Sequence, residues 1–119
     1  MGWFKVSKNF DDRNLIIKKI EYLQEIRKTV DYLGRIIFQS GTTAKNRNYD
    51  IITSDKITSY PSLHRILSEA DSMALDNPWK FAETCNMACN KIDDLIYSLK
   101  KERDEITFGK KNIEKGWID

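Results

Sequence analysis

The sequence predicts an all-α protein, folded as an antiparallel bundle of three to four helices, two of them long. Apolar residues recur at steps of three and four over two long segments, and only five glycines and two prolines interrupt the 119 residues. This spacing places apolar side chains along one side of a helix. The length suits one core. We therefore expect a single helical domain over residues 1–119, with an N-terminal arm at 1–10 and a C-terminal tail at 107–119.

The first long helix is expected over residues 11–40. Its packing seam would consist of Ile16, Ile20, Leu23, Ile26, Val30, Leu33 and Ile37. Asp11 or Asp12 suits the first turn, where an acidic side chain complements the helix dipole. Gly41 suits a left-handed cap after the last turn. Both ends of the segment thus agree with the period of its seam.

Residues 41–60 are open between a short helix, a hairpin turning near Ser54 and Asp55, and a loop over the core. A structureless stretch of this length is unusual inside a compact domain, which favours one short element, a helical turn rather than a strand. Ser59 as N-cap and Pro61 in the first turn then predict a helix that ends at Leu75.

The second long helix is expected over residues 78–106, because Asn77 followed by Pro78 caps and begins a helix. Its seam would consist of Phe81, Cys85, Ala88, Ile92, Leu95, Leu99 and Ile106. Ala82, Cys89 and Ile96 lie alongside this seam. Trp79, one place after Pro78, is expected to shield the joint between the two helices.

Composition narrows the function classes. Net charge is only +2, too small to gather nucleic acid without local clustering. No segment has the roughly twenty apolar residues of a membrane span. The N-terminus lacks the apolar core of a secretory signal, and two cysteines are too few for a disulfide scaffold. We expect a cytoplasmic protein that contacts no membrane.

The two cysteines, Cys85 and Cys89, stand one turn apart on the expected last helix. At this spacing their Cβ atoms lie about 5 to 6 Å apart, too far for an undistorted disulfide. A metal site would need further ligands, and the chain has one histidine, His64. We interpret them as small core residues that let a neighbouring helix approach. Metal binding at a dimer interface and redox sensing are the alternatives.

No constellation of catalytic residues is recognisable. We interpret His64 as a residue at the boundary of the core rather than a catalytic one. The carboxylate pairs lack the Glu-x-x-His spacing of a di-iron bundle. The sequence also contains no phosphate-binding loop. We therefore expect a protein that is not an enzyme, with no catalytic residue, metal site or cofactor.

A nucleic-acid-binding regulator is the alternative reading. Residues 36–52 could form a helix-turn-helix in which Lys45, Arg47 and Asn48 read bases, supported by Lys110 and Lys111 in the tail. Against this, the second helix of such a motif should bury an aliphatic residue where Arg47 stands. We therefore do not favour nucleic-acid binding.

Unequal helix lengths favour a protein-binding role. The long helices would extend roughly 43 to 45 Å and the middle helix only about 25 Å, so part of the long seam lacks a cover. Burial of such a strip drives association. The expected partner-binding residues are Trp3, Phe4, Leu95, Ile96, Leu99, Ile106, Trp117 and Ile118.

We therefore expect a helical protein–protein interaction module with a regulatory, inhibitory or structural role. Its partner would be another protein or a second copy of itself, as in a homodimer. The abundance of isoleucine, lysine and asparagine suggests AT-rich coding DNA, which we associate with phages or mobile elements.

Overall fold

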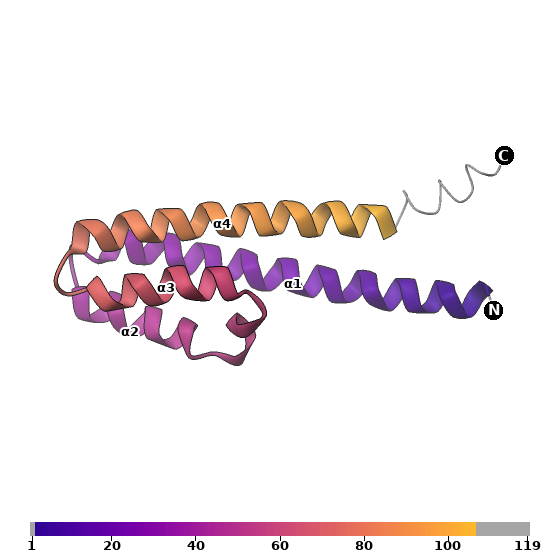
Figure 1. Ribbon diagram of the computed structural model, residues 1–119, viewed down its shortest axis with the longest axis horizontal. Helices are drawn as coiled ribbons and strands as arrows, with labels where there is room; N and C mark the ends of the chain where they lie inside the picture. Colours follow the sequence, from indigo (N-terminus) through magenta and orange to yellow (C-terminus); the bar gives the residue numbers. More distant parts are fainter. Residues whose placement is uncertain (1, 107–119) are drawn as a thin grey trace. The chain divides into compact units, whose positions relative to one another are not determined.

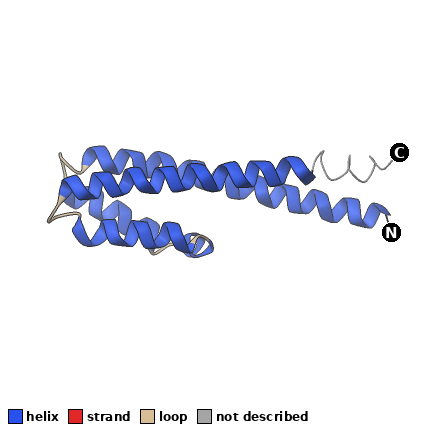
Figure 2. Cartoon of the chain, turned by 45° about the horizontal axis from the view of Figure 1, so that its top comes forward, coloured by secondary structure: helices blue, strands red, loops and turns tan. Residues whose placement is uncertain are grey.

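The computed structural model describes the backbone of residues 2–106 and the side chains of residues 11–106. Within this range the chain is all helical, as predicted: α1 (Gly2–Ile36), α2 (Gly41–Ile52), the 3-10 helix η1 (Asp55–Ser59), α3 (Pro61–Met73) and α4 (Pro78–Asp104). Residues 2–106 contain no strand (Figure 2). The helices pack on one another, which confirms the helical bundle.

The chain divides into two compact units, and the boundary falls inside both long helices. The bundle unit comprises Glu25–Asp93, with the second part of α1, all of α2, η1 and α3, and the first part of α4. The hairpin unit comprises residues 1–24 and 94–119, of which the structure describes two helical segments, 2–24 and 94–106. Whether the chain behaves as a single domain stays a prediction.

The bundle unit has a closed apolar core. Large apolar side chains from every one of its helical segments except α2 are fully buried: Val30, Leu33, Ile57, Leu63, Leu67, Phe81 and Ile92. The α2 helix adds Ala44 and Ile51 to the core and packs beside α3 (Figure 1). Residues 41–60 therefore form a full helix and a 3-10 turn, and the open alternatives are resolved in favour of helix. Ile57 anchors the 3-10 turn in the core.

Two short polar side chains define the starts of α2 and α4. The Ser40 hydroxyl accepts a hydrogen bond from the Thr43 backbone N–H at 3.3 Å, and Asn77 Oδ1 accepts one from the Lys80 N–H at 3.1 Å. Each satisfies a donor that a helix start would otherwise leave without a partner. The cap at Asn77 was predicted correctly.

The prediction for Gly41 was wrong. Ser40 caps a new helix whose first residue is Gly41, and no glycine among the described residues has a positive φ. The first helix accordingly ends at Ile36 rather than at Ser40. Ser59 is not the cap of α3 either, because it ends η1 and Tyr60 holds the N-cap position before Pro61.

The start of α1 also differs from the prediction. The helix begins at Gly2, so residues 2–10, predicted as an arm, are helical, and Asp11 and Asp12 lie inside the helix rather than at its start. Between residues 3 and 33 the sequence contains neither glycine nor proline, and therefore nothing that would stop a helix. Charge at the first turn was a weaker signal than this absence of breakers.

The hairpin unit packs two antiparallel helical segments against each other (Figure 1). Among its described side chains, at 11–24 and 94–106, the buried apolar residues are Ile16, Ile20, Leu23 and Ile96. All four belong to the predicted seams or lie beside them. No described helix combines the length and apolar composition of a membrane-spanning segment.

Candidate interaction surfaces

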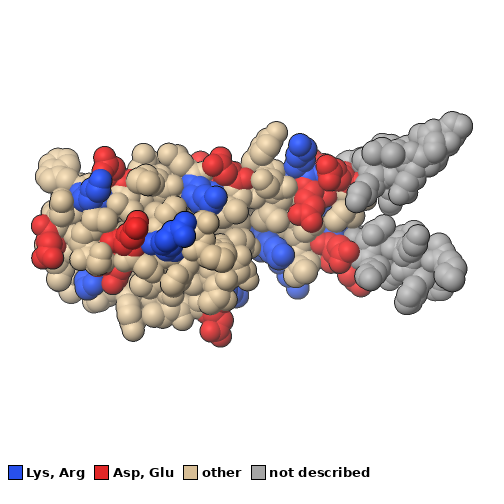
Figure 3. All heavy atoms as spheres, viewed as in Figure 1, with Lys and Arg blue, Asp and Glu red and all other residues tan. Residues whose placement is uncertain are grey.

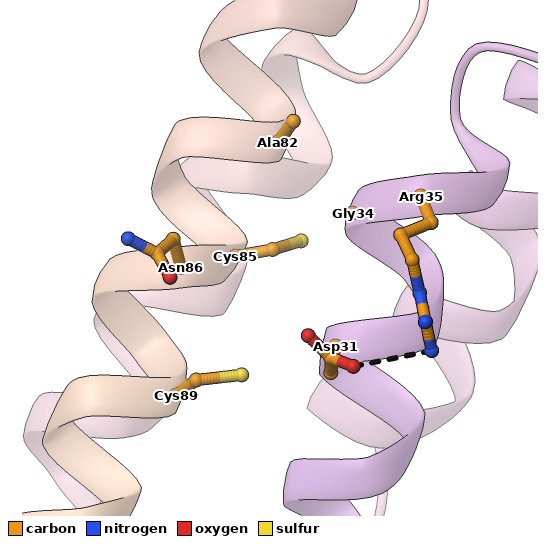
Figure 4. A pocket seen from close by; sticks show the side chains of 7 residues that line it. All are labelled: Asp31, Gly34, Arg35, Ala82, Cys85, Asn86 and Cys89. Carbon is orange, nitrogen blue, oxygen red and sulfur yellow. Dashed lines mark ion pairs between the residues drawn. The ribbon is translucent and has the colours of Figure 1, made fainter.

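Small residues bring α1 and α4 close together in the bundle unit. A Cβ placed on Gly34 would lie 3.3 Å from Cys85 Cβ and 3.7 Å from the Ala82 carbonyl oxygen. Both cysteines are buried, with their sulfur atoms directed toward α1 (Figure 4). The Cys89 thiol lies 3.8 Å from the Arg27 carbonyl oxygen. The interpretation of the cysteines as small packing residues is confirmed.

A shallow groove of about 170 Å³ lies over this contact. Its lining residues are Asp31, Gly34, Arg35, Ala82, Cys85, Asn86 and Cys89. The Arg35 guanidinium is paired with the Asp31 carboxylate at 3.1 Å, so these two side chains add no net charge at the edge of the groove. No group of three or more potential metal ligands occurs within the described part of the chain. The groove offers small polar contacts and no assembled reactive centre.

Burial keeps both thiols protonated near neutral pH. It raises the pKa of Cys85 to about 12, with a smaller contribution from Cys89. Burial also raises the pKa of Cys89, although Arg27 opposes the shift. The thiolate is the reactive form of cysteine, and these surroundings disfavour it.

The raised pKa of Cys85 predicts a loss of stability at alkaline pH. The pKa of the Cys85 thiol is about 12 in the folded state against an ordinary value of 9.0. Ionisation of this thiol therefore leaves the free energy of unfolding unchanged below pH 9 and lowers it as the pH rises further, because the unfolded state loses its proton first. The slope should reach up to about 1.4 kcal/mol per pH unit. We expect urea unfolding between pH 8 and 10.5 to show this decline, and Cys85→Ala to remove the corresponding part of it. Equal slopes in both proteins would contradict the assignment.

Three large apolar side chains are exposed where the α1–α2 and α3–α4 joints meet, at one end of the bundle unit. Phe38 is 49% exposed, Leu75 60% and Trp79 75%. The Phe38 and Trp79 rings contact at a centroid distance of 4.7 Å. Leu75 Cδ2 reaches the other joint, 3.3 Å from where a Cβ on Gly41 would lie. We call Phe38, Leu75 and Trp79 the aromatic end surface.

The expectation that Trp79 shields its joint is therefore wrong, because most of its side chain faces solvent. Sequence reasoning missed all three residues of the aromatic end surface. A signal was present: Phe38 and Leu75 each follow a buried residue by one position, and Trp79 precedes Phe81 by two, so none lies on a packing seam. A large apolar residue off the seam, next to a helix end, remains exposed.

Charges around these surfaces are mixed in sign. Basic and acidic side chains are interspersed on the face shown in Figure 3. Near Trp79 on α4, Lys80 is paired with Glu83 at 3.0 Å. Exposed pairs of this kind contribute little energy. The apolar surface rather than a charge field is the dominant feature at this end.

Two of the three residues predicted to read bases, Lys45 and Asn48, are engaged in the fold instead. Asn48 is fully buried and donates from Nδ2 to the Leu67 carbonyl oxygen at 2.8 Å. Lys45 Nζ lies 3.0 Å from Asp71 Oδ2 and also donates to the Asp71 carbonyl oxygen. Arg47 is exposed, with its guanidinium carbon 5.5 Å from the Tyr32 ring centroid. Only Arg47 has the exposure that base recognition requires.

Four of the predicted partner-binding residues, three in α4 and one just after it, lie together in the hairpin unit. Ile96 is buried, whereas Leu95, Leu99 and Ile106 are half-buried. These three side chains retain accessible apolar surface, in the part of the chain that has only two described helical segments.

The remaining predicted residues have other placements. Trp3 and Phe4 belong to the first turns of α1, and their side chains are outside the described set. Trp117 and Ile118, the basic pair Lys110 and Lys111, and the predicted tail at 107–119 lie beyond the described residues. His64 on α3 is half-buried, as expected of a boundary residue.

Comparison of the chain with protein-family models, with curated proteins and with solved structures found no match.

Proposed function

We propose that this protein is a helical protein-binding module that engages its partner through the aromatic end surface. The observation that carries the proposal is the exposure of Trp79, Leu75 and Phe38 at the two joints, with the Phe38 and Trp79 rings in contact. Contiguous exposed apolar groups of this kind mark interaction sites, and tryptophan is enriched among the residues that dominate binding energy. Its biological role would be regulatory, inhibitory or structural.

The rigidity of the surface supports the proposal. Phe38 follows the buried Ile37, Leu75 follows the buried Ala74, and Trp79 lies two residues after the Asn77 cap. Side chains held on a packed scaffold lose less conformational entropy on binding than those on a free loop. A partner with an apolar cleft could therefore gain most of the contact energy.

A paired-variant capture experiment tests this proposal. Bound proteins would be isolated with three tagged full-length proteins: the wild type, its Phe38→Ala/Trp79→Ala variant and a Met87→Ala control. Met87 is 53% exposed on α4 and lies outside the aromatic end surface. We expect the wild type and the control to retain a defined protein, and the double variant to retain at least 10-fold less of that protein. Equal retention by all three, or by none, would refute the proposal.

Non-enzymatic function, a cytoplasmic location and a phage or mobile-element origin remain predictions from the sequence. The nucleic-acid alternative is not favoured by the structure, since Lys45 and Asn48 are engaged within the bundle unit. Binding of duplex DNA with a steep dependence on salt would favour that alternative over ours.

A further inference from the structure

A single charged residue lies in the two joints beside the aromatic end surface. The joints comprise residues 37–40, between α1 and α2, and residues 74–77, between α3 and α4. Asp76 is the only charged residue at these positions, directly after Leu75 and three positions before Trp79. Its side chain is exposed and forms no ion pair with a described residue. The apolar surface at this end is therefore flanked by one negative charge.

The Asp76 carboxylate has no structural task that would occupy its oxygens. Asn77, the next residue, is the one that caps α4, because its Oδ1 accepts the hydrogen bond from the Lys80 N–H at 3.1 Å. Asp76 precedes the positive end of the α4 dipole, and for an exposed carboxylate this interaction is favourable but weak. The carboxylate oxygens are therefore free to accept hydrogen bonds from another molecule.

The neighbouring charges cancel and leave Asp76 uncompensated. Arg35, in the last turn of α1, is paired with Asp31 at 3.1 Å. Lys80, in the first turn of α4, is paired with Glu83 at 3.0 Å. Each pair lies within one helix and adds no net charge. A partner that approaches the joints therefore meets a local excess of negative charge, which favours a cationic group on the partner.

The Trp79 ring is also available to a cation. Elsewhere in the bundle unit the exposed Tyr32 ring already has a cation of this chain, with the Arg47 guanidinium carbon 5.5 Å from its centroid. Trp79 contacts the Phe38 ring, and within the described part of the chain no cationic side chain lies over it. Tryptophan is the aromatic residue that attracts cations most strongly. The ring and the carboxylate thus favour the same kind of group.

We infer that the partner of the aromatic end surface is a protein segment that presents an arginine beside its apolar side chains, and that this arginine binds Asp76 and the Trp79 ring. The inference rests on the proposed function and names the chemistry of the partner. A guanidinium stacks on an aromatic ring and donates two parallel hydrogen bonds to a carboxylate, whereas the ammonium of lysine is a strongly hydrated point charge. The aliphatic stem of arginine can cover Leu75.

Peptide selection on the full-length protein tests the inference. A phage-displayed library of random peptides would be selected on the wild type, and peptides retained equally by the Phe38→Ala/Trp79→Ala variant would be discarded. We expect the remaining peptides to combine arginine with aromatic or aliphatic residues and to be depleted in acidic ones. Circular dichroism would establish that every variant keeps its helix content.

A double-mutant cycle then shows where the arginine binds. A selected peptide, and its analogue with neutral citrulline in place of arginine, would be titrated against the wild type and Asp76→Asn. Each change alone should weaken binding at least about 3-fold. Both together should weaken it by less than the product of the single effects, because they remove the same contact. Asp50→Asn is the matched control, since Asp50 is exposed in the last turn of α2, away from the joints, and should leave the affinity unchanged.

The results distinguish failure of this inference from failure of the proposed function. Peptides that require Phe38 and Trp79 but lack arginine would overturn the inference alone. So would single effects that multiply in the cycle, or equal effects of Asp76→Asn and Asp50→Asn. If no selected peptide requires Phe38 and Trp79, the proposed function and the inference are both overturned.

Discussion

Phe81→Ala is expected to destabilise the protein by about 3 to 5 kcal/mol. Phe81 is the largest fully buried side chain among the described residues and lies in the core of the bundle unit. Its truncation removes apolar surface from the core and leaves a cavity whose walls, fixed in helices, can collapse only in part. Domains of this size commonly have a free energy of unfolding of only about 5 to 15 kcal/mol, so this loss would be a large fraction of the total stability.

Chemical denaturation followed by circular dichroism would measure this change. Met87→Ala is the matched control, because Met87 lies on the same helix and is exposed, and its truncation should change stability by no more than about 0.5 kcal/mol. A loss below about 1 kcal/mol for Phe81→Ala would mean that the core described here is not closed around this ring.

The packing seams could be predicted because they depend on local periodicity alone. Ile16, Ile20, Leu23, Val30, Leu33 and Ile37 all proved buried, as did Phe81, Cys85, Ala88 and Ile92. Any arrangement of neighbouring helices must cover these stripes, so their burial does not require the topology to be known. The exceptions are Ile26 in the first seam and Leu95, Leu99 and Ile106 in the second, which are only half-buried.

The helix ends were harder to predict because one residue type serves opposite purposes. Glycine can end a helix in the left-handed conformation, or begin one where little room is left for a side chain. At Gly41 the second role prevails: a Cβ there would meet Leu75 Cδ2 at 3.3 Å. Serine is a preferred N-cap residue, so Ser40 before Gly41 was a signal for a helix start that the prediction overlooked.

The aromatic end surface and the buried amide were missed for a related reason. Trp79 has the composition of a core residue, and only the position of its helix relative to the others shows that it faces solvent. Asn48 has the composition of a surface residue, yet it occupies a buried position between Ala44 and Ile51. Ala44, Asn48 and Ile51 are spaced as residues on one face of a helix, and this spacing was a usable signal that Asn48 is buried.

Asn48→Asp is the second substitution expected to have a large effect, and its effect should depend on pH. The side chain is fully buried, and Oδ1 has no hydrogen-bond donor among the described residues. Lys45, one turn earlier on α2, is already paired with Asp71. A carboxylate at this position would lie against the Leu67 carbonyl oxygen without compensation, and burial of an unpaired charge is costly. The folded state should therefore raise the pKa of the new carboxyl well above its ordinary value of about 3.9.

The sign of the pH effect follows from this shift. A carboxyl whose pKa is raised by folding is protonated in both states below about pH 4, where the penalty is small and its O–H can donate to the Leu67 carbonyl oxygen in place of the amide. As pH rises, the unfolded state loses its proton first, so stability should fall by up to about 1.4 kcal/mol per pH unit, reaching up to about 4 kcal/mol at pH 7. Urea unfolding at pH 4, 5.5 and 7, relative to the wild type at each pH, would measure it.

Asn48→Leu separates the charge from the loss of the amide. It removes the hydrogen bond to Leu67 and also the buried oxygen that has no donor, so its effect should stay within about 1 kcal/mol and be independent of pH. A uniform loss at all three pH values in both variants would show that Asn48 acts through its shape. A loss that grows with pH for Asn48→Asp alone would show that the contact between α2 and α3 is dry, because only there does a carboxylate lack water to solvate it.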